Sequence, residues 1–225
     1  MGIGHVALAL GASKAEPRLN VGWLVFAAVV SDFLLGIFAA LGLEHATVPP
    51  DFANRHYLLF TFPYSHGLLA LTVWSTILGF LVSRALGFRG QRVWILVALV
   101  ALSHFLLDGL VHVAGLPLVG ENSPKLGLGL WNHMPFELSL ETLMAIIGLV
   151  IYWKITGADR SALSRYGIAL FVIIMTGLTW TQLLPSPAPT ARVLTISWIV
   201  APIVLSAIAY ALDQRRVRQV VSSGN

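Results

Sequence analysis

The sequence predicts an all-α fold: a polytopic transmembrane helix bundle of about six spans, plus a short N-terminal re-entrant or surface helix. Three observations predict it. Of the 225 residues, 57% are hydrophobic and only 11% are charged, whereas soluble domains carry about 25% charged residues. The apolar residues form blocks long enough to cross a hydrocarbon layer about 30 Å thick. The basic residues also gather in alternate loops, as they do in multi-pass membrane proteins.

The spans form a single integral membrane domain. A half-inserted segment is expected at 1–18, site-bearing spans 1–4 at 20–157 and supporting spans 5–6 at 164–213. The last span contains Pro202, which transmembrane helices tolerate. The six blocks are Val21–Leu43, Tyr64–Ser83, Val93–Gly115, Met134–Trp153, Tyr166–Leu184 and Val193–Leu212.

The basic residues predict the orientation. With six spans, eleven of them fall on the side that holds both termini: Lys14, Arg18, Arg84, Arg89, Arg92, Lys154, Arg160, Arg165, Arg215, Arg216 and Arg218. Only Arg55, Lys125 and Arg192 fall on the other side. The positive-inside rule therefore places both termini in the cytoplasm. The net charge of +4 is explained by topology, so we expect the lipid bilayer as a partner and no nucleic acid.

The chain contains no cysteine, which excludes disulfides, thiolate metal sites and cysteine nucleophiles. Ionisable residues inside membrane spans are costly, and each one is a candidate for function. They occur only in spans 1–4; the last two spans carry no acid or histidine. They are Asp32, His66, His104, Asp108, His112, His133, Glu137 and Glu141.

Depth brings several of these side chains together. With a helical rise of about 1.5 Å per residue, Asp32, His104 and Glu141 each lie roughly 18–20 Å from the cytoplasmic ends of their spans. The segment His104-Phe-Leu-Leu-Asp108-Gly-Leu-Val-His112 places its three polar side chains on one helix face. A histidine and an aspartate one turn apart can bind a metal ion. The alternative is a hydrogen-bonded pair that only stabilises the bundle.

His5 lies in the apolar stretch Ile3–Ala12, which is too short to span a membrane. It is nine residues from Lys14, or about 13 Å along a helix, which is near the level of Asp32. One interpretation is a half-inserted helix that brings His5 to the same depth. The other is an amphipathic surface helix with His5 exposed.

Two further residues are candidates for catalysis. Glu141 follows Glu137 by one turn, so one of them is protonated or a cation lies between them. Glu141, or Glu137 in its place, is a candidate general base or further metal ligand. Asn132 and Ser65 could orient a substrate or cap helices. The longest external loops, Glu44–Pro63 and Leu116–Trp131, could form a lid.

These motifs resemble those of the LexA-regulated, membrane-bound metal-dependent hydrolases of bacteria, whose fold is related to zinc-dependent phospholipase C. The resemblance covers Gly4-His5 to Glu141. Asp32 matches an aspartate of the family, His66 in Tyr-Ser-His-Gly matches its Thr-His-Ser, and Ser103-His104-Phe-Leu-Leu-Asp108 matches its Ser-His-x-x-x-Asp. The chain departs from the family in having one acid instead of Pro-Asp-x-Asp, and Phe62-Pro63-Tyr64 where the family has a basic residue.

The resemblance implies a metal-dependent hydrolase in the bacterial inner membrane. Its implied ligands are His5, Asp32, His66, His104 and Asp108, with His112 added by the helix spacing. Three imidazoles and two carboxylates suit Zn, with Mn or Fe as alternatives. A buried site in the outer half of the membrane implies a lipid or lipid-linked ester or phosphodiester substrate. The alternatives from the same residues are a proton or cation transporter and a haem protein with two of His66, His104 and His112 as axial ligands.

Overall fold

The computed structural model describes residues 1–156 and 162–223, and it confirms the all-α bundle. Five of its helices are long and apolar enough to cross a membrane, namely α5 (Leu68–Ala85), α6 (Gln91–Val111), α7 (Met134–Thr156), α8 (Ala162–Trp180) and α9 (Ala191–Ser223). The pair α2 (Val21–Ala28) and α3 (Val30–Ala40) supplies a sixth span if it is counted as one. Arg160 and the predicted boundary at 157 lie outside the described residues.

The first span is broken. α2 and α3 meet at Val29 with a bend of 51°. Sequence analysis predicted one continuous helix over Val21–Leu43, because the break contains no glycine or proline. Irregular backbone at membrane depth is tolerated where protein covers it, and α6 and α9 pack against these two short helices.

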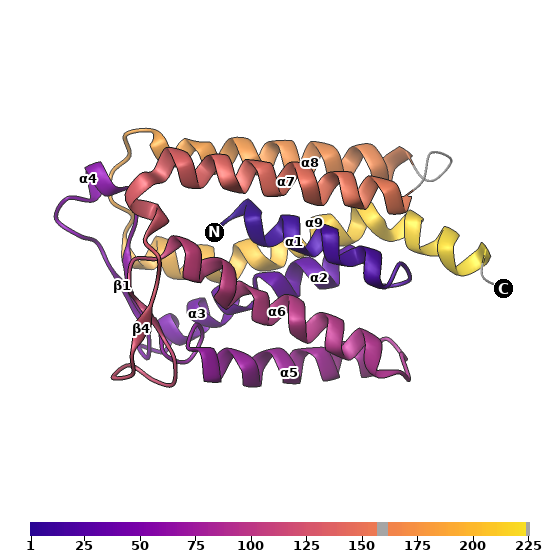
Figure 1. Cartoon of the computed structure of the whole chain (residues 1–225), viewed down its shortest axis with the longest axis horizontal. Helices are drawn as coiled ribbons and strands as arrows, with labels where there is room; N and C mark the ends of the chain where they lie inside the picture. Colours follow the sequence, from indigo (N-terminus) through magenta and orange to yellow (C-terminus); the bar gives the residue numbers. More distant parts are fainter. Residues whose placement is uncertain (157–161, 224–225) are drawn as a thin grey trace.

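The short helix α1 (Ile3–Ala12) lies inside the bundle. Ile3, Val6 and Leu10 are completely buried, and His5 is only 1% exposed. The expectation of a surface helix with an exposed His5 is therefore wrong, and α1 packs against the other helices of the bundle. Figure 1 shows the N-terminus surrounded by helices, with α1 running from there toward the end of the molecule where the C-terminus lies. The turn η1 (Ser13–Ala15) then leads to α2.

Glycine allows α1 to approach α7 closely. A Cβ at Gly148 of α7 would overlap the backbone carbonyl of Ala7. Small residues of this kind let membrane helices pack backbone to backbone. Because α7 also carries Glu141, this contact places the start of α1 beside that carboxylate.

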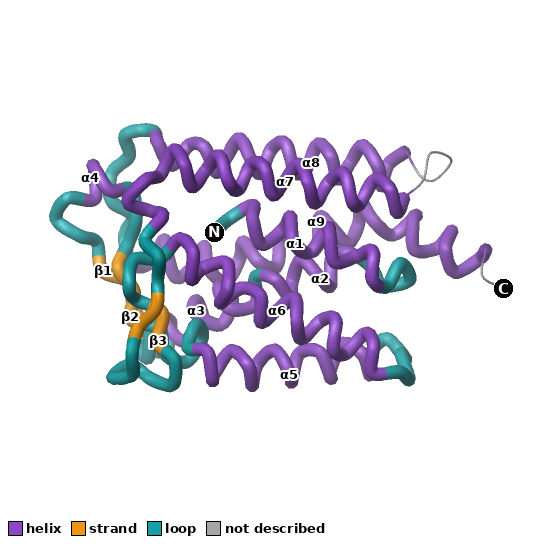
Figure 2. The backbone as a smooth tube through the Cα atoms, in the orientation of Figure 1, coloured by secondary structure: helices purple, strands orange, loops and turns teal. Residues whose placement is uncertain are grey.

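The loops at the opposite end from the C-terminus carry all the described strands (Figure 2). β1 (His45–Thr47) pairs antiparallel with β2 (Leu59–Thr61), and β3 (Leu116–Pro117) pairs antiparallel with β4 (Lys125–Leu126). The same end holds α4 (Phe52–Arg55) and η2 (Leu130–His133), while η3 (Thr181–Leu183) follows α8.

Several ionisable side chains are buried in the molecule, while many large apolar side chains lie on its surface. Leu106, Leu170 and Ile173 are 58–68% exposed, whereas His104, Asp108 and Glu141 are at most 3% exposed. Water-soluble proteins bury apolar groups and expose charges, so this inversion supports a lipid environment around the helices.

Candidate metal centre

Five polar side chains converge near the middle of the bundle, and they come from four separate parts of the fold. His5 comes from the first turn of α1, and Asp32 from the first turn of α3. His66 lies in the turn that precedes α5, whereas sequence analysis placed it inside a helix. His104 and Asp108 lie one turn apart on α6. The described residues therefore contain two overlapping groups able to hold a metal ion, His5–His104–Asp108 and Asp32–His66–His104.

The separations between these side chains suit shared coordination. His104 Nε2 lies 3.2 Å from His66 Nε2 and 3.2 Å from Asp108 Oδ2. His5 Nε2 lies 3.1 Å from Asp108 Oδ1, and His66 Nε2 lies 3.7 Å from Asp32 Oδ1. Ligands about 2.0–2.1 Å from a tetrahedral Zn²⁺ stand roughly 3.3 Å apart. Each of the two groups, with two imidazoles and one carboxylate, therefore fits a divalent ion on both chemistry and spacing.

The backbone break orients His104. Its Nδ1 donates to the carbonyl of Ala28, the last residue of α2, over 2.7 Å. Because a carbonyl only accepts, Nδ1 carries the proton, and in the neutral ring Nε2 presents a lone pair. Metal-binding histidines usually have their second nitrogen held in this way. His66 has a comparable partner, since its Nδ1 lies 2.7 Å from the hydroxyl of Ser65.

Glu44 holds the turn that carries His66. Its carboxylate accepts hydrogen bonds from the N–H groups of Tyr64 and Ser65, at 2.7 and 2.9 Å. Burial raises the pKa of Glu44, while the hydrogen bonds from Ser65 act in the opposite direction. In the sequence Glu44 is only the first residue of an external loop, and this contact could not be predicted because its partners are twenty residues away in the chain.

One candidate ligand, Asp32, is partly exposed, whereas the others are buried. The side chains of His5, His66, His104 and Asp108 are 1–4% exposed, whereas that of Asp32 is 33% exposed. Asp32 is therefore the one member of the cluster whose side chain is partly exposed.

Aromatic side chains from the two long outer loops lie against the histidines. The rings of Phe62 and His66 are 4.5 Å apart, and those of Trp131 and His112 are 4.0 Å apart. Phe60 contacts both Phe62 and Trp131. The loops expected as a lid thus place Phe60, Phe62 and Trp131 over the outer side of the cluster.

The other predicted residues take different places. His112 is the C-terminal cap of α6, and its Nε2 lies 3.3 Å from Asp108 Oδ2; it belongs to neither metal-capable group. Asn132 is exposed at the outer surface, where its Oδ1 accepts a hydrogen bond from Tyr57. Glu141 is buried and accepts hydrogen bonds from the N–H groups of Gly2 and Gly4.

The amino group of Met1 was not anticipated from the sequence. It lies 3.0 Å from Asp108 Oδ1, the oxygen that His5 also approaches. Asp108 is therefore surrounded by four histidines, His5, His66, His104 and His112, and by one ammonium group.

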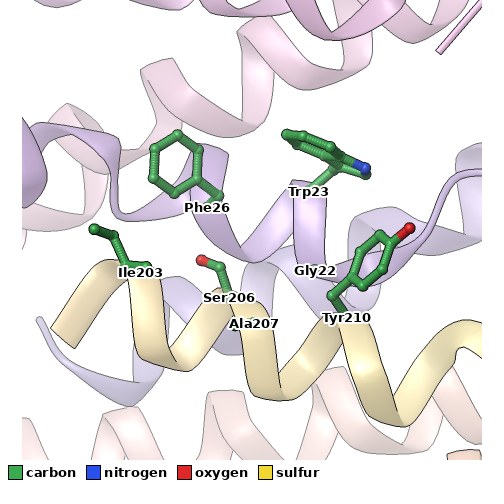
Figure 3. Close-up of a pocket in the computed structure, with 7 residues that line it drawn as sticks. All are labelled: Gly22, Trp23, Phe26, Ile203, Ser206, Ala207 and Tyr210. Carbon is green, nitrogen blue, oxygen red and sulfur yellow. The ribbon is translucent and has the colours of Figure 1, made fainter. Parts of the chain in front are cut away.

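A separate groove lies on the flank of the bundle. Figure 3 shows the residues that line it, among them Trp23 and Phe26 of α2 and Ile203, Ser206 and Tyr210 of α9. The groove has a volume of about 310 Å³, and none of its lining residues belongs to the cluster.

Comparison with known proteins adds no assignment. No protein-family model matches the chain, and neither a curated protein nor a solved structure matches it. The case for function therefore rests on the geometry of the His/Asp cluster.

Proposed function

We propose that this protein is a membrane-embedded, metal-dependent hydrolase that acts on an ester or phosphodiester of a lipid or lipid-linked substrate. The observation that supports it is the convergence of His5, Asp32, His66, His104 and Asp108 within the bundle. Zn is the proposed metal, with Mn and Fe as alternatives. A bound ion of this kind lowers the pKa of its water and polarises a carbonyl or phosphoryl oxygen.

The residues of the chain would perform the remaining tasks. Asp32, the exposed ligand, lies where a water and a scissile bond would meet the centre. Ala28 and Ser65 keep the rings of His104 and His66 turned toward it. Phe60, Phe62 and Trp131 shield its outer side, which favours entry of a lipid-like substrate from the bilayer.

Activity toward lipid phosphoesters and esters tests the proposal. Protein purified in detergent and loaded with Zn²⁺ or Mn²⁺ should release product from at least one substrate, and chelation should abolish it. Asp32→Asn should reduce the rate without unfolding the protein, because Asp32 is partly exposed. Turnover that is unchanged in both Asp32→Asn and His104→Ala would mean that the cluster is not the active site.

Proton or cation transport is the second candidate, and the break between α2 and α3 favours it. Transporters place binding residues where a span is interrupted, and Asp32 follows this break directly. Proteoliposomes with an internal pH or cation dye separate the two functions: a flux that Asp32→Asn abolishes, without hydrolysis, would support transport. The Nε2 atoms of His66 and His104 are only 3.2 Å apart, which disfavours this pair as axial ligands on the two faces of a haem.

A further inference from the structure

The backbone N–H groups at the start of α1 donate hydrogen bonds to a side chain of another helix. The N-terminal cap of α1 is Gly2, which has no side chain to bond the free N–H groups of the first turn. Those groups lie deep in the bundle, where an N–H group without a partner is costly. Glu141 supplies the acceptor from α7: Oε1 lies 3.1 Å from Gly2 N, and Oε2 lies 2.8 Å from Gly4 N.

This contact is adjacent to a metal ligand. Gly4 directly precedes His5, whose Nε2 lies 3.1 Å from Asp108 and whose ring stacks on His104 with centroids 3.9 Å apart. The Nδ1 atom of His5 is buried and has no hydrogen-bond partner among the described residues. The ring of His5 is therefore not held by a hydrogen bond at Nδ1, whereas the rings of His104 and His66 are.

The carboxylate of Glu141 is thus engaged with α1 through both oxygens. Neither metal-capable group among the described residues includes it. A negative charge at a helix N-terminus is favourable, because it complements the partial positive charge of the free N–H groups. The same helix α7 contacts Ala7 through Gly148, so α7 fixes α1 at two successive levels.

We propose that Glu141 is a positioning residue: by capping the buried N-terminus of α1, it holds His5 in the metal centre. This role differs from the general base or further metal ligand that the sequence suggested for Glu141. The inference rests on the proposed metal site. It explains how His5 is held in place, although its Nδ1 atom has no hydrogen-bond partner among the described residues.

A double-mutant cycle with Co²⁺ as the probe tests it. Glu141→Ala should weaken Co²⁺ binding by about 10–100-fold, the usual effect of losing an outer-shell partner. It should also change the Co²⁺ absorption spectrum in the same way as His5→Ala. In the His5→Ala background, Glu141→Ala should cause no further loss. Glu141→Gln should retain most of the affinity, because its amide oxygen still accepts one N–H bond.

Ser139→Ala is the control on the same helix, since Ser139 is exposed on α7 and bonds only the carbonyl of Pro135. It should leave Co²⁺ affinity and spectrum unchanged. Independent, additive losses from Glu141→Ala and His5→Ala would overturn the proposal, because Glu141 would then act as a ligand or base in its own right. A Glu141→Ala protein with wild-type affinity and spectrum would overturn it as well.

A second measurement needs no metal. The chain has no cysteine, and Ile3 is completely buried at the start of α1, so Ile3→Cys reports on release of this helix. Maleimide should label Ile3→Cys slowly, and at least tenfold faster when Glu141→Ala is added. Equal labelling rates would contradict the capping role. If the wild-type protein bound no Co²⁺ while labelling still depended on Glu141, the proposed hydrolase would fail and the capping of α1 would stand.

Discussion

At the residue scale, single hydrogen bonds orient the histidine rings of the candidate metal centre. The pairing of His104 with Asp108 could be predicted from their spacing of four, because residues one turn apart share a helix face. The partners that orient the rings could not. Ala28 contributes only a backbone carbonyl, which is available because the helix ends there. Ser65 is next to His66 in a turn, where sequence analysis predicted a helix. Such contacts depend on tertiary structure that no local pattern encodes.

The Ser65 hydroxyl should matter for metal affinity. We expect Ser65→Ala to weaken Zn²⁺ or Co²⁺ binding by about 10–100-fold, because it removes the partner of His66 Nδ1. Ser139→Ala is the control: Ser139 is exposed on α7 and bonds only the carbonyl of Pro135. Metal titration of both variants checks this, and equal affinities in the two would contradict the role given to Ser65.

Glu44 should give the folded state a recognisable pH dependence. A raised pKa means that the folded protein binds the proton more tightly than the unfolded chain does, so this contribution to stability is present at low pH. It is lost as the pH rises from the ordinary glutamate value, near 4.3, through the raised value in the folded protein. Glu44→Gln should remove this component. Thermal unfolding of both proteins across acidic pH measures it, and parallel curves would count against it.

At the element scale, the sequence predicted the positions of the spans well, because long apolar blocks are a strong signal. Span two is shorter than predicted, since 64–67 form a turn. The break at Val29 was missed, because neither glycine nor proline marks it. The place of α1 was left open between two interpretations, since a ten-residue apolar stretch fits a surface or a half-inserted helix equally well.

The packing of α1 on α7 can be tested at Gly148. A methyl group there would overlap the Ala7 carbonyl, so Gly148→Ala should destabilise the protein by about 1–3 kcal/mol, as over-packing does. Gly177→Ala on α8 is the matched control, since a Cβ there meets no atom within 4 Å. It should be neutral or slightly stabilising, because alanine favours helix over glycine. Thermal melts in the same detergent compare them; equal melting temperatures would argue against close α1–α7 contact.

At the scale of the whole molecule, two polar centres hold the bundle together. One is the candidate metal centre. The other, at the end that holds the C-terminus, joins Arg216 and Asp213 of α9 to Tyr152 of α7 and to the segment before α2. Arg216 bonds Asp213 at 2.5 and 2.7 Å and the carbonyl of Leu19 at 3.0 Å, and it is completely buried. Sequence analysis used Arg216 only as one of the basic residues that predict membrane orientation, because its carbonyl partners before α2 are nearly 200 residues away in the chain.

Disrupting this second centre should lower the free energy of unfolding. Arg216→Met leaves Asp213 buried without its cation, which typically costs about 3–5 kcal/mol. Arg215→Met, at an exposed neighbouring position, should have little effect. Adding Asp213→Asn to Arg216→Met should recover part of the loss, since the unpaired charge is then removed. Denaturation of the four proteins would refute this if the two arginine variants behaved alike.

The metal content of the purified protein decides whether the His/Asp cluster is a metal site. Wild-type protein in detergent should contain about one equivalent of Zn, Mn or Fe by elemental mass spectrometry, and the His104→Ala, Asp108→Ala double variant should have lost it. Absence of bound metal from both proteins, even after reloading, would contradict the account: the cluster would then be a hydrogen-bonded network, and transport would replace hydrolysis as the function to pursue.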